Sequence, residues 1–225
     1  FHVCIDLLHK KNKVFGVDDL NDYYDIDLKK DRNKILNKNK NFFFKKINIC
    51  DYNKLFSFTK KNKIKVIINL AAQAGVRYSI LKPDTYFNSN IKGFFNILEI
   101  SRKVKIKHLI FASTSSVYGK SKKFPLSEDM NTDKPLSFYA ATKKSNELMA
   151  YSYSNIYKIP ITGLRFFTVY GPYGRPDMAL YKFTNSIIKN KSISLFNNGN
   201  HTRDWTYIAD VSESICRLIN KVPRL

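Results

Sequence analysis

The sequence predicts an α/β protein built on a doubly wound parallel sheet of the Rossmann type, with part of a smaller substrate-binding domain. Short runs rich in β-branched and aromatic residues alternate with longer stretches of helical periodicity along most of the chain. Four of these runs end in acidic, small or hydroxyl residues: Asp18 and residues 71–73, 113–116 and 166–168. Ligands of such sheets bind beyond the carboxyl ends of the strands. We therefore expect these four groups to share one crevice.

The N-terminal part of the chain alternates helices and strands. Apolar residues at Phe1, Val3, Ile5, Leu7 and Leu8 predict an amphipathic helix. Strands are expected at residues 13–17, 42–47 and 66–70, with helices at residues 28–36 and 52–60. Pro83 is expected to begin a long helix that runs through Arg102, because proline is favoured in the first turn of a helix.

The alternation continues as far as residue 170 and then loosens. Strands are expected at residues 108–112 and 161–166, on either side of a long helix at residues 138–157. Beyond them we expect a turn-rich loop at 171–176, a helix at 179–189, a short strand at 193–196, an extended segment at 203–207 and a closing helix at 211–220.

The composition is typical of a globular protein. The chain of 225 residues is 44% hydrophobic and 14% aromatic, and it is long enough to bury a sizeable core. No apolar run approaches the roughly 20 residues of a membrane-spanning helix, so we expect no membrane partner. Cys4, Cys50 and Cys216 are far apart, and the four histidines are scattered. This pattern predicts reduced thiols, no metal site and a cytoplasmic location.

The formal net charge of +21 invites a nucleic-acid-binding interpretation. The lysines, however, are spread along the chain instead of being massed on one element, and Asn and Ile are also abundant, as in proteins from AT-rich genes. Basic residues do not alternate with aromatic ones, as a single-strand-binding groove would require. We therefore expect no nucleic-acid partner and a moderate attraction for anionic small molecules.

The most informative stretch lies within the long helix expected at residues 138–157. Tyr139 and Lys143 are four residues apart, so in a helix they share one face. A phenol titrates near ~10 and is a poor base at neutral pH, but a neighbouring cation favours the phenolate, which can exchange protons with a substrate hydroxyl. This spacing is common by chance, and the alternative is a helix face with an aromatic residue and a solvated lysine. The hydroxyl cluster at residues 113–116 favours catalysis.

Six segments together resemble the extended short-chain dehydrogenase/reductase family of nucleotide-sugar enzymes. They are residues 17–24, 70–79, 139–144, 164–172, 174–179 and 203–208. The resemblance covers essentially the whole chain, and within the family these segments look most like the UDP-glucuronate 4-epimerase branch. It implies an NAD-binding Rossmann-like domain over residues 1–169 and a partial nucleotide-sugar-binding region over residues 170–225, interleaved with the first.

The resemblance implies a tightly held NAD and three catalytic residues. Tyr139 would be the general base, Lys143 would lower the pKa of Tyr139 and hold the nicotinamide ribose, and Thr114 would complete the proton path. Asp18 would take the adenosine ribose hydroxyls, and its charge would disfavour a 2′-phosphate, so NAD is expected over NADP. The alternative for Asp18 is a residue that starts a loop and makes its own turn. The residues implied to line the cofactor are Asp18, Asn48, Ile49, Leu70, Ala71, Ala72, Ser113, Tyr139, Lys143 and Phe166.

The substrate that the resemblance implies is a UDP-sugar. Arg203 would meet its diphosphate, and Arg175 would meet the nucleotide or a sugar carboxylate. The alternatives are that Arg175 pairs with Asp177, that Arg77 is a solvated loop charge, and that the serines at 115–116 cap a strand. The residues implied to bind substrate are Arg77, Ser115, Ser116, Thr168, Arg175 and Arg203.

The implied reaction is NAD-dependent 4-epimerisation of UDP-glucuronate to UDP-galacturonate through a transient 4-keto sugar. Similar dehydratases carry Asp-Glu at the positions of Ser115 and Ser116, and decarboxylases usually carry Glu at the position of Ser116. The serines of this chain can hydrogen-bond a carboxylate without expelling anything. The alternatives are a UDP-glucose 4-epimerase, a decarboxylase or dehydratase of the same family, and an inactive basic binding remnant. The resemblance also implies a homodimer through helices 84–102 and 138–157.

Two features depart from the family pattern. The family's glycine-rich phosphate loop would precede Phe1, and the end of its sugar domain would follow Leu225, so we expect a fragment. Asn48 stands where relatives usually carry an Asp that meets the adenine amino group. The amide oxygen of asparagine can accept the same hydrogen bond.

Overall fold

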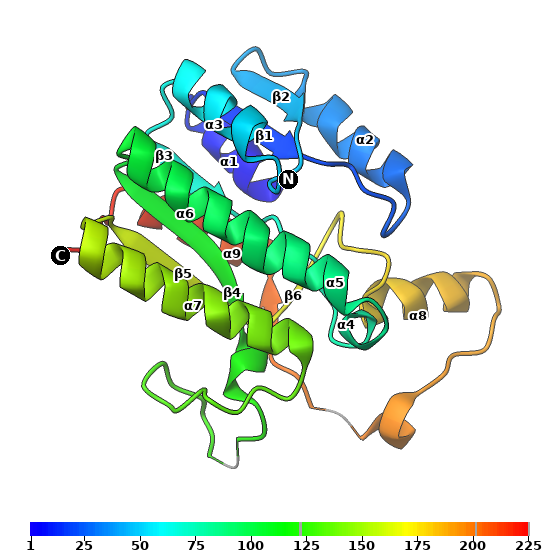
Figure 1. The fold of residues 1–225 in the computed structure, drawn as a ribbon. Helices are drawn as coiled ribbons and strands as arrows, with labels where there is room; N and C mark the ends of the chain where they lie inside the picture. The colour runs from blue at the N-terminus through cyan, green and yellow to red at the C-terminus, as the bar shows by residue number, and fades with distance from the viewer. Residues whose placement is uncertain (122, 201, 225) are drawn as a thin grey trace. The chain divides into compact units, whose positions relative to one another are not determined.

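The computed structural model describes residues 1–121, 123–200 and 202–224, and helices and strands alternate along the chain (Figure 1). They gather into two compact units. The larger unit contains Val17–Asp19, Lys45–Phe166 and the residues from Arg217 onward, and the smaller unit contains Phe1–Gly16, Leu20–Phe44 and Phe167–Cys216. These units are defined by compactness, so the expected functional boundary between residues 169 and 170 stays a prediction.

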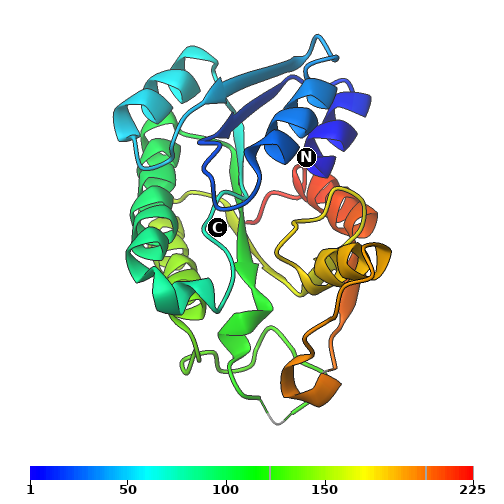
Figure 2. The same cartoon turned by 90° about the vertical axis from the view of Figure 1, so that its right-hand side faces the viewer.

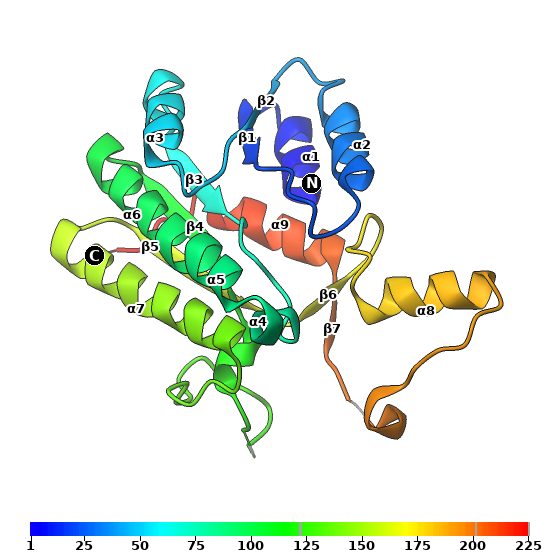
Figure 3. The same ribbon diagram turned by 45° about the vertical axis from the view of Figure 1, so that its right-hand side comes forward.

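The larger unit is built on a parallel sheet with the strand order β3-β4-β5. Its strands are β3 (Val66–Asn69), β4 (His108–Thr114) and β5 (Ile161–Phe166). The helices α6 (Gly93–Val104) and α7 (Phe138–Tyr157) lie side by side on one face of this sheet (Figures 2 and 3). The predicted α/β fold with a parallel, Rossmann-like sheet is confirmed.

The core of the larger unit joins this sheet to its helices. Leu98 and Ile100 of α6 are fully buried, and so is Leu109 of β4, while Phe94 and Phe111 pack ring against ring with centroids 4.9 Å apart. Each such side chain stabilises the fold by about 1.5–3 kcal/mol through its removal from water. Helix α3 (Tyr52–Lys61) packs on α6 and contributes Leu55 to the same cluster.

Helix α7 has the bounds that the sequence predicts, and both of its ends show why. At its start the Ser137 hydroxyl accepts a hydrogen bond of 3.1 Å from the Ala140 amide, a cap worth about 0.5–2 kcal/mol. At its end Lys158 adopts the left-handed conformation (φ 53°, ψ 44°) in which many helices stop. The expected pair, Tyr139 and Lys143, therefore lies in the first two turns of a well-capped helix.

The single long helix expected from Pro83 to Arg102 is wrong in detail. The structure shows α5 (Pro83–Tyr86), a π-helical segment η1 (Phe87–Lys92) and then α6, with a short α4 (Tyr78–Leu81) before them. A π turn carries an extra residue, and such turns are frequent at functional sites. At the junction α6 approaches Ile49 so closely that a Cβ on Gly93 would lie 2.6 Å from Ile49 Cδ1. The apolar periodicity of the sequence does not reveal this change of helix type.

The first half of the smaller unit follows the expected pattern. Leu8, Val14, Leu36 and Phe42 form its small buried cluster, one residue from each element. The elements are α1 (His2–His9), β1 (Val14–Asp18), α2 (Ile26–Leu36) and β2 (Phe42–Lys46), and the two strands pair.

The second half of the smaller unit departs from the expected pattern at one strand. Residues 191–195 form no strand, and a 3-10 helix η3 (Phe196–Gly199) follows them, so the strand expected at residues 193–196 is wrong. Positive φ angles at Asn197 and Asn198 turn the chain there. Instead, β6 (Thr168–Tyr170) pairs in parallel with β7 (Trp205–Tyr207). Along the chain, β7 follows α8 (Ala179–Ile188) and η3 and precedes α9 (Ile208–Leu218).

None of the helices in the described ranges is both long and apolar enough to cross a membrane. The same ranges contain no group of three or more His, Cys, Asp or Glu side chains that could hold a metal ion.

Candidate active site

The hydroxyl cluster lies partly inside a strand and partly in the turn that follows. Strand β4 extends to Thr114, two residues beyond the expected end, and continues into a 3-10 helix η2 (Ser115–Tyr118). The Thr114 hydroxyl caps this turn, since it accepts a bond of 3.2 Å from the Ser116 amide and donates one of 3.2 Å to Ser116 Oγ. The strand-end cap is therefore Thr114, and the hydroxyl of Ser115 is not used for it.

Lys143 is the most unusual charged group of the larger unit. It is 3% exposed, and no residue in the described part of the chain accepts a hydrogen bond from its ammonium or forms an ion pair with it. Burial therefore lowers the pKa of Lys143 to about 8, because a cation is disfavoured away from water. One turn earlier, the half-buried Tyr139 packs edge-on against the ring of Tyr86 with centroids 6.1 Å apart.

The loop after β3 is held by two residues that the sequence interpretation missed. Tyr86 Oη donates to the carbonyl oxygens of Ala74 (2.9 Å) and Gly75 (2.5 Å). Asn90, in the π-helical segment, accepts from the amide of Gln73 (2.8 Å) and donates to its carbonyl (3.0 Å). Its Nδ2 also donates to Thr142 Oγ1 (3.0 Å), beside Lys143. Asn90 follows Asn88 and Ser89 in the sequence, so no local pattern distinguishes it from its polar neighbours.

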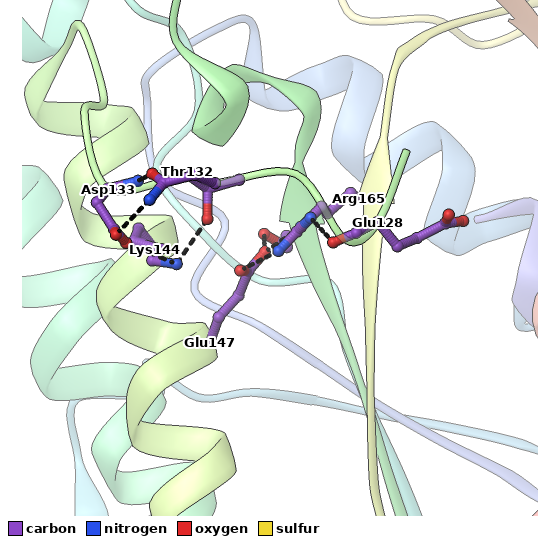
Figure 4. Close-up of polar contacts among 8 residues, drawn as sticks. Glu128, Thr132, Asp133, Lys144, Glu147 and Arg165 are labelled. Atoms are coloured by element: carbon purple, nitrogen blue, oxygen red, sulfur yellow. Dashed lines mark hydrogen bonds and ion pairs between the residues drawn. The ribbon is translucent and has the colours of Figure 1, made fainter. Parts of the chain in front are cut away.

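A polar network joins β4, β5 and α7 of the larger unit (Figure 4). Arg165 of β5 donates to both carboxylate oxygens of Glu147 of α7, at 2.9 Å each. Ser113 of β4 donates to the same carboxylate at 2.5 Å. Burial would raise the pKa of Glu147, but the hydrogen bonds from Arg165 and Ser113 outweigh it and hold that pKa below its ordinary value. Ser113, which the resemblance places beside the cofactor, thus has its hydroxyl engaged within the protein.

The predicted adenosine-side residues lie where two strands, β1 and β2, end. Asp18 is exposed at the end of β1, and its carbonyl accepts from the Ile47 amide at 3.1 Å. Asn48 donates to Asp19 Oδ2 at 3.1 Å and accepts from the Cys50 amide at 2.8 Å. Ile49 is a core residue, so only its backbone is available to a ligand.

The remaining cofactor residues differ in exposure. The structure places Leu70, Ala71 and Ala72 on the surface, directly after β3. Phe166 is half-buried at the end of β5, where it neighbours Thr114 in the sheet register.

The predicted substrate residues are divided between the two units. Arg77 is an exposed residue of the larger unit. In the smaller unit, Thr168 begins β6, and the exposed Arg203 donates to the Thr202 carbonyl at 2.7 Å. Arg175 forms a bidentate ion pair with Asp177 at 2.9 and 2.7 Å, as the alternative interpretation expects. The roles of these residues toward a substrate stay predictions.

A depression of about 450 Å³ lies elsewhere in the larger unit. It is lined mainly by exposed lysines near the amino ends of β3 and β4, among them Lys65 and Lys107. The predicted site lies at the carboxyl ends of these strands, so this depression belongs to the opposite edge of the sheet.

Comparison with known proteins gives concordant results. Residues 1–224 match the model of the NAD dependent epimerase/dehydratase family. Protein CapI of Staphylococcus aureus is 54% identical over 220 residues, which are 98% of this chain and 66% of the relative. A probable UDP-glucuronate 4-epimerase of Rhizobium meliloti is 46% identical over 223 residues, 99% of this chain and 65% of the relative. The chain thus spans about two thirds of the length of these curated relatives.

Solved structures give the same result for the fold. The crystal structure of UDP-glucuronic acid 4-epimerase from Bacillus cereus, in complex with UDP-glucuronic acid and NAD, superposes with a TM-score of 0.89 at 35% identity. The superposition covers 97% of this chain and 69% of that one. On the sequence match and the fold together, this chain belongs to the NAD dependent epimerase/dehydratase family.

Proposed function

We propose that the protein containing this chain is an NAD-dependent 4-epimerase of UDP-sugars, with UDP-glucuronate as the preferred substrate. The proposal is supported by relatives such as the probable UDP-glucuronate 4-epimerase of Rhizobium meliloti and by the Bacillus cereus enzyme, solved with UDP-glucuronic acid and NAD. The observation that carries it is the buried residue Lys143, whose ammonium has no hydrogen-bond or ion-pair partner among the described residues and which lies one helical turn from Tyr139.

The residues present fit NAD. A buried cation needs an acceptor, and the hydroxyls of a ribose would supply acceptors to Lys143. Gln73 Nε2 is a second buried donor without a partner among the described residues, on the loop that follows β3. Leu70, Ala71 and Ala72 would pass their exposed backbone along the cofactor, and Asp18 would bind the adenosine ribose.

In the proposed mechanism the chain's own residues move the proton. Tyr139 takes the proton of the sugar C4 hydroxyl, and the ammonium of Lys143 favours the phenolate that can do so. Thr114, whose hydroxyl donates to Ser116 in this structure, would turn that proton toward the same oxygen when substrate is bound. NAD, held by Asp18 and Lys143, would supply the reversible hydride chemistry at C4. Tyr139 then gives the proton back.

The choice of sugar rests on the turn after β4. Ser115 and Ser116 are half-buried hydroxyl residues that can hydrogen-bond a C6 carboxylate. Position 116 carries no glutamate, so we expect epimerisation without loss of carbon dioxide. Arg203, Arg77 and Thr168 complete the proposed contacts to the UDP-sugar. UDP-glucose 4-epimerase is the second candidate, supported by a Thermotoga maritima enzyme solved with UDP-glucose that superposes at a TM-score of 0.86 and 28% identity.

The decisive assay supplies UDP-glucuronate and UDP-glucose in competition to the full-length protein. UDP-galacturonate is expected as the main product. A UDP-pentose as the main product would instead indicate a decarboxylase, and no turnover of either sugar would indicate the inactive binding remnant. Tyr139→Phe is expected to lower kcat by at least ~10²-fold without unfolding the protein, the usual scale for a lost acid/base group. Near-normal turnover of this variant would contradict the assignment of Tyr139.

The proposal includes a cytoplasmic homodimer that pairs helices 84–102 and 138–157. Helix α7 exposes Leu148 (59%), Tyr151 (75%) and Ile156 (64%), and the adjacent α6 exposes Phe95. A second copy of the chain would cover this apolar surface. Leu148→Glu with Tyr151→Glu should yield monomers in sedimentation analysis, whereas Phe43→Glu on β2 should not change the oligomeric state.

A further inference from the structure

We propose that Glu147 and Arg165 are positioning residues, which fix β4, the turn η2 and α7, the segments that carry the proposed catalytic and sugar-binding groups, relative to one another. The proposal rests on the proposed function, but it concerns residues that touch neither the sugar nor the cofactor. It assigns a role to the buried ion pair of Figure 4. Glu147 lies one helical turn from Lys143, and Arg165 neighbours Ser113 in the sheet register.

Arg165 uses four of the five N–H donors of its guanidinium. Nε and Nη2 donate to the two oxygens of Glu147. Nη1 donates to Tyr118 Oη at 3.2 Å and to the Glu128 carbonyl at 3.0 Å. The guanidinium also lies over the Tyr118 ring, with its Cζ 5.0 Å from the centroid. One side chain of β5 thus holds α7, the turn η2 and the loop that contains Glu128.

Each contact ends next to a residue with a proposed chemical role. Glu147 follows Lys143 by four residues, as Lys143 follows Tyr139, so the three lie along one stripe of α7. Ser113, which donates to Glu147, precedes Thr114 and neighbours Arg165 in the sheet register. Tyr118 ends the turn that contains Ser115 and Ser116.

A second clamp on α7 holds the same loop. Lys144 donates to Thr132 Oγ1 at 2.6 Å and lies 3.5 Å from Asp133 Oδ1 (Figure 4). The described loop residues 123–137 are therefore attached to β5 through Glu128 and to α7 through Thr132 and Asp133. Its path leads directly into the N-cap of the helix that begins before Tyr139.

Stability alone does not explain the pair. Replacing a buried ion pair with apolar residues of similar volume is often neutral or stabilising, because burial of two charges is costly. Hydrogen bonds in a fork, however, fix direction as well as distance. A displacement of about 1 Å in a catalytic group can cost about 100-fold in rate. We therefore infer that the Glu147–Arg165 pair serves to fix the placement of the catalytic groups.

The test is the double variant Glu147→Leu with Arg165→Met, which keeps the net charge and removes the fork. In the NAD-loaded, full-length enzyme, kcat is expected to fall by about 10–100-fold while KM and NAD content stay within about twofold. The matched control is Glu99→Leu with Arg102→Met. This pair on α6 has the same bidentate geometry, and Tyr153 supplies the same kind of hydroxyl donor. Its kcat is expected to be that of the wild type.

Two further variants address the case in which the double variant does not fold. Ser113→Ala removes one donor, and Arg165→Lys keeps the charge without the fork. Both should lower kcat severalfold at unchanged KM. Wild-type kcat in Arg165→Lys, or in the folded double variant, would overturn the proposal.

Amide hydrogen exchange provides a readout that does not need activity. Exchange at residues 115–121 and 123–136 should accelerate at least about tenfold in the variants of the pair and not in the control. Unchanged exchange at these residues would also overturn the positioning role, whether or not the wild-type protein turns over a UDP-sugar. Lack of turnover by the wild type would, by itself, contradict only the proposed function.

Discussion

Glu147 and Arg165 form two parallel hydrogen bonds of 2.9 Å between α7 and β5, and both side chains are about four-fifths buried. The pKa of Glu147 in the folded protein lies below its ordinary value of 4.5, because the bonds from Arg165 and Ser113 outweigh the effect of burial. As the pH falls, the unfolded chain therefore binds more protons than the folded protein does, and the stability due to this pair is lost at acid pH.

This relationship predicts the acid stability of the protein. The contribution of Glu147 is fully present above the ordinary pKa of 4.5 and declines as the pH falls through the lower folded value. Glu147→Gln should lower the free energy of unfolding by up to about 3–5 kcal/mol at neutral pH, since it leaves Arg165 without its charge partner. The variant should also lose less stability than the wild type between neutral and acid pH. Denaturant titrations at several pH values measure both effects, and parallel curves would contradict the prediction.

Lys143 is expected to reduce stability in the absence of cofactor. Its folded pKa of about 8 lies below the ordinary value of 10.5, so the folded protein is penalised while the ammonium is protonated. Lys143→Met should raise the free energy of unfolding of the NAD-free protein at pH 7 by up to about 3 kcal/mol, at about 1.36 kcal/mol per pKa unit, and abolish turnover. The gain should shrink as the pH rises from 8 to 10.5. A loss of stability at pH 7 would contradict this assignment.

Asp18 should select between the two dinucleotides. A carboxylate at the end of β1 accepts ribose hydroxyls and repels a 2′-phosphate. The full-length protein should therefore bind NAD more tightly than NADP. Asp18→Asn should reduce the difference between the two dissociation constants. Isothermal titration with both dinucleotides measures it, with Asp22→Asn as a control. Equal or tighter binding of NADP by the wild type would contradict the role of Asp18.

Arg175 should contribute to the choice of sugar in spite of its pairing with Asp177. Charge-assisted bonds to a C6 carboxylate are worth about 1.5–3 kcal/mol, and a hydroxymethyl group cannot match them. Arg175→Ala should reduce the preference for UDP-glucuronate over UDP-glucose at least about tenfold. The same variant should lower the rate of UDP-glucose conversion much less. The control Lys182→Ala should change the rate of neither UDP-glucuronate nor UDP-glucose conversion. An equal loss for both sugars would show that the Arg175–Asp177 pair serves only the local fold.

Three features could be predicted from the sequence: the α/β class, the helix at residues 138–157 and the position of Tyr139 and Lys143 on one helix face. These depend on local periodicity, capping residues and a four-residue spacing, all of which can be read along the chain. The extension of β4 to Thr114 and the absence of a strand at residues 193–196 depend on which strand each segment can pair with in the folded protein. The periodicity of the sequence therefore could not predict them.

The environment of each proposed functional group, in contrast, depends on how the folded chain packs. The burial that lowers the pKa of Lys143 comes from elements remote in sequence, and so does the clamp of Asn90 on Gln73 and Thr142. The same holds for Arg165, which meets Glu147, Tyr118 and Glu128 across intervals of 18 to 47 residues. Local sequence patterns carry no information on such long-range contacts, because they form only when the sheet and its helices pack.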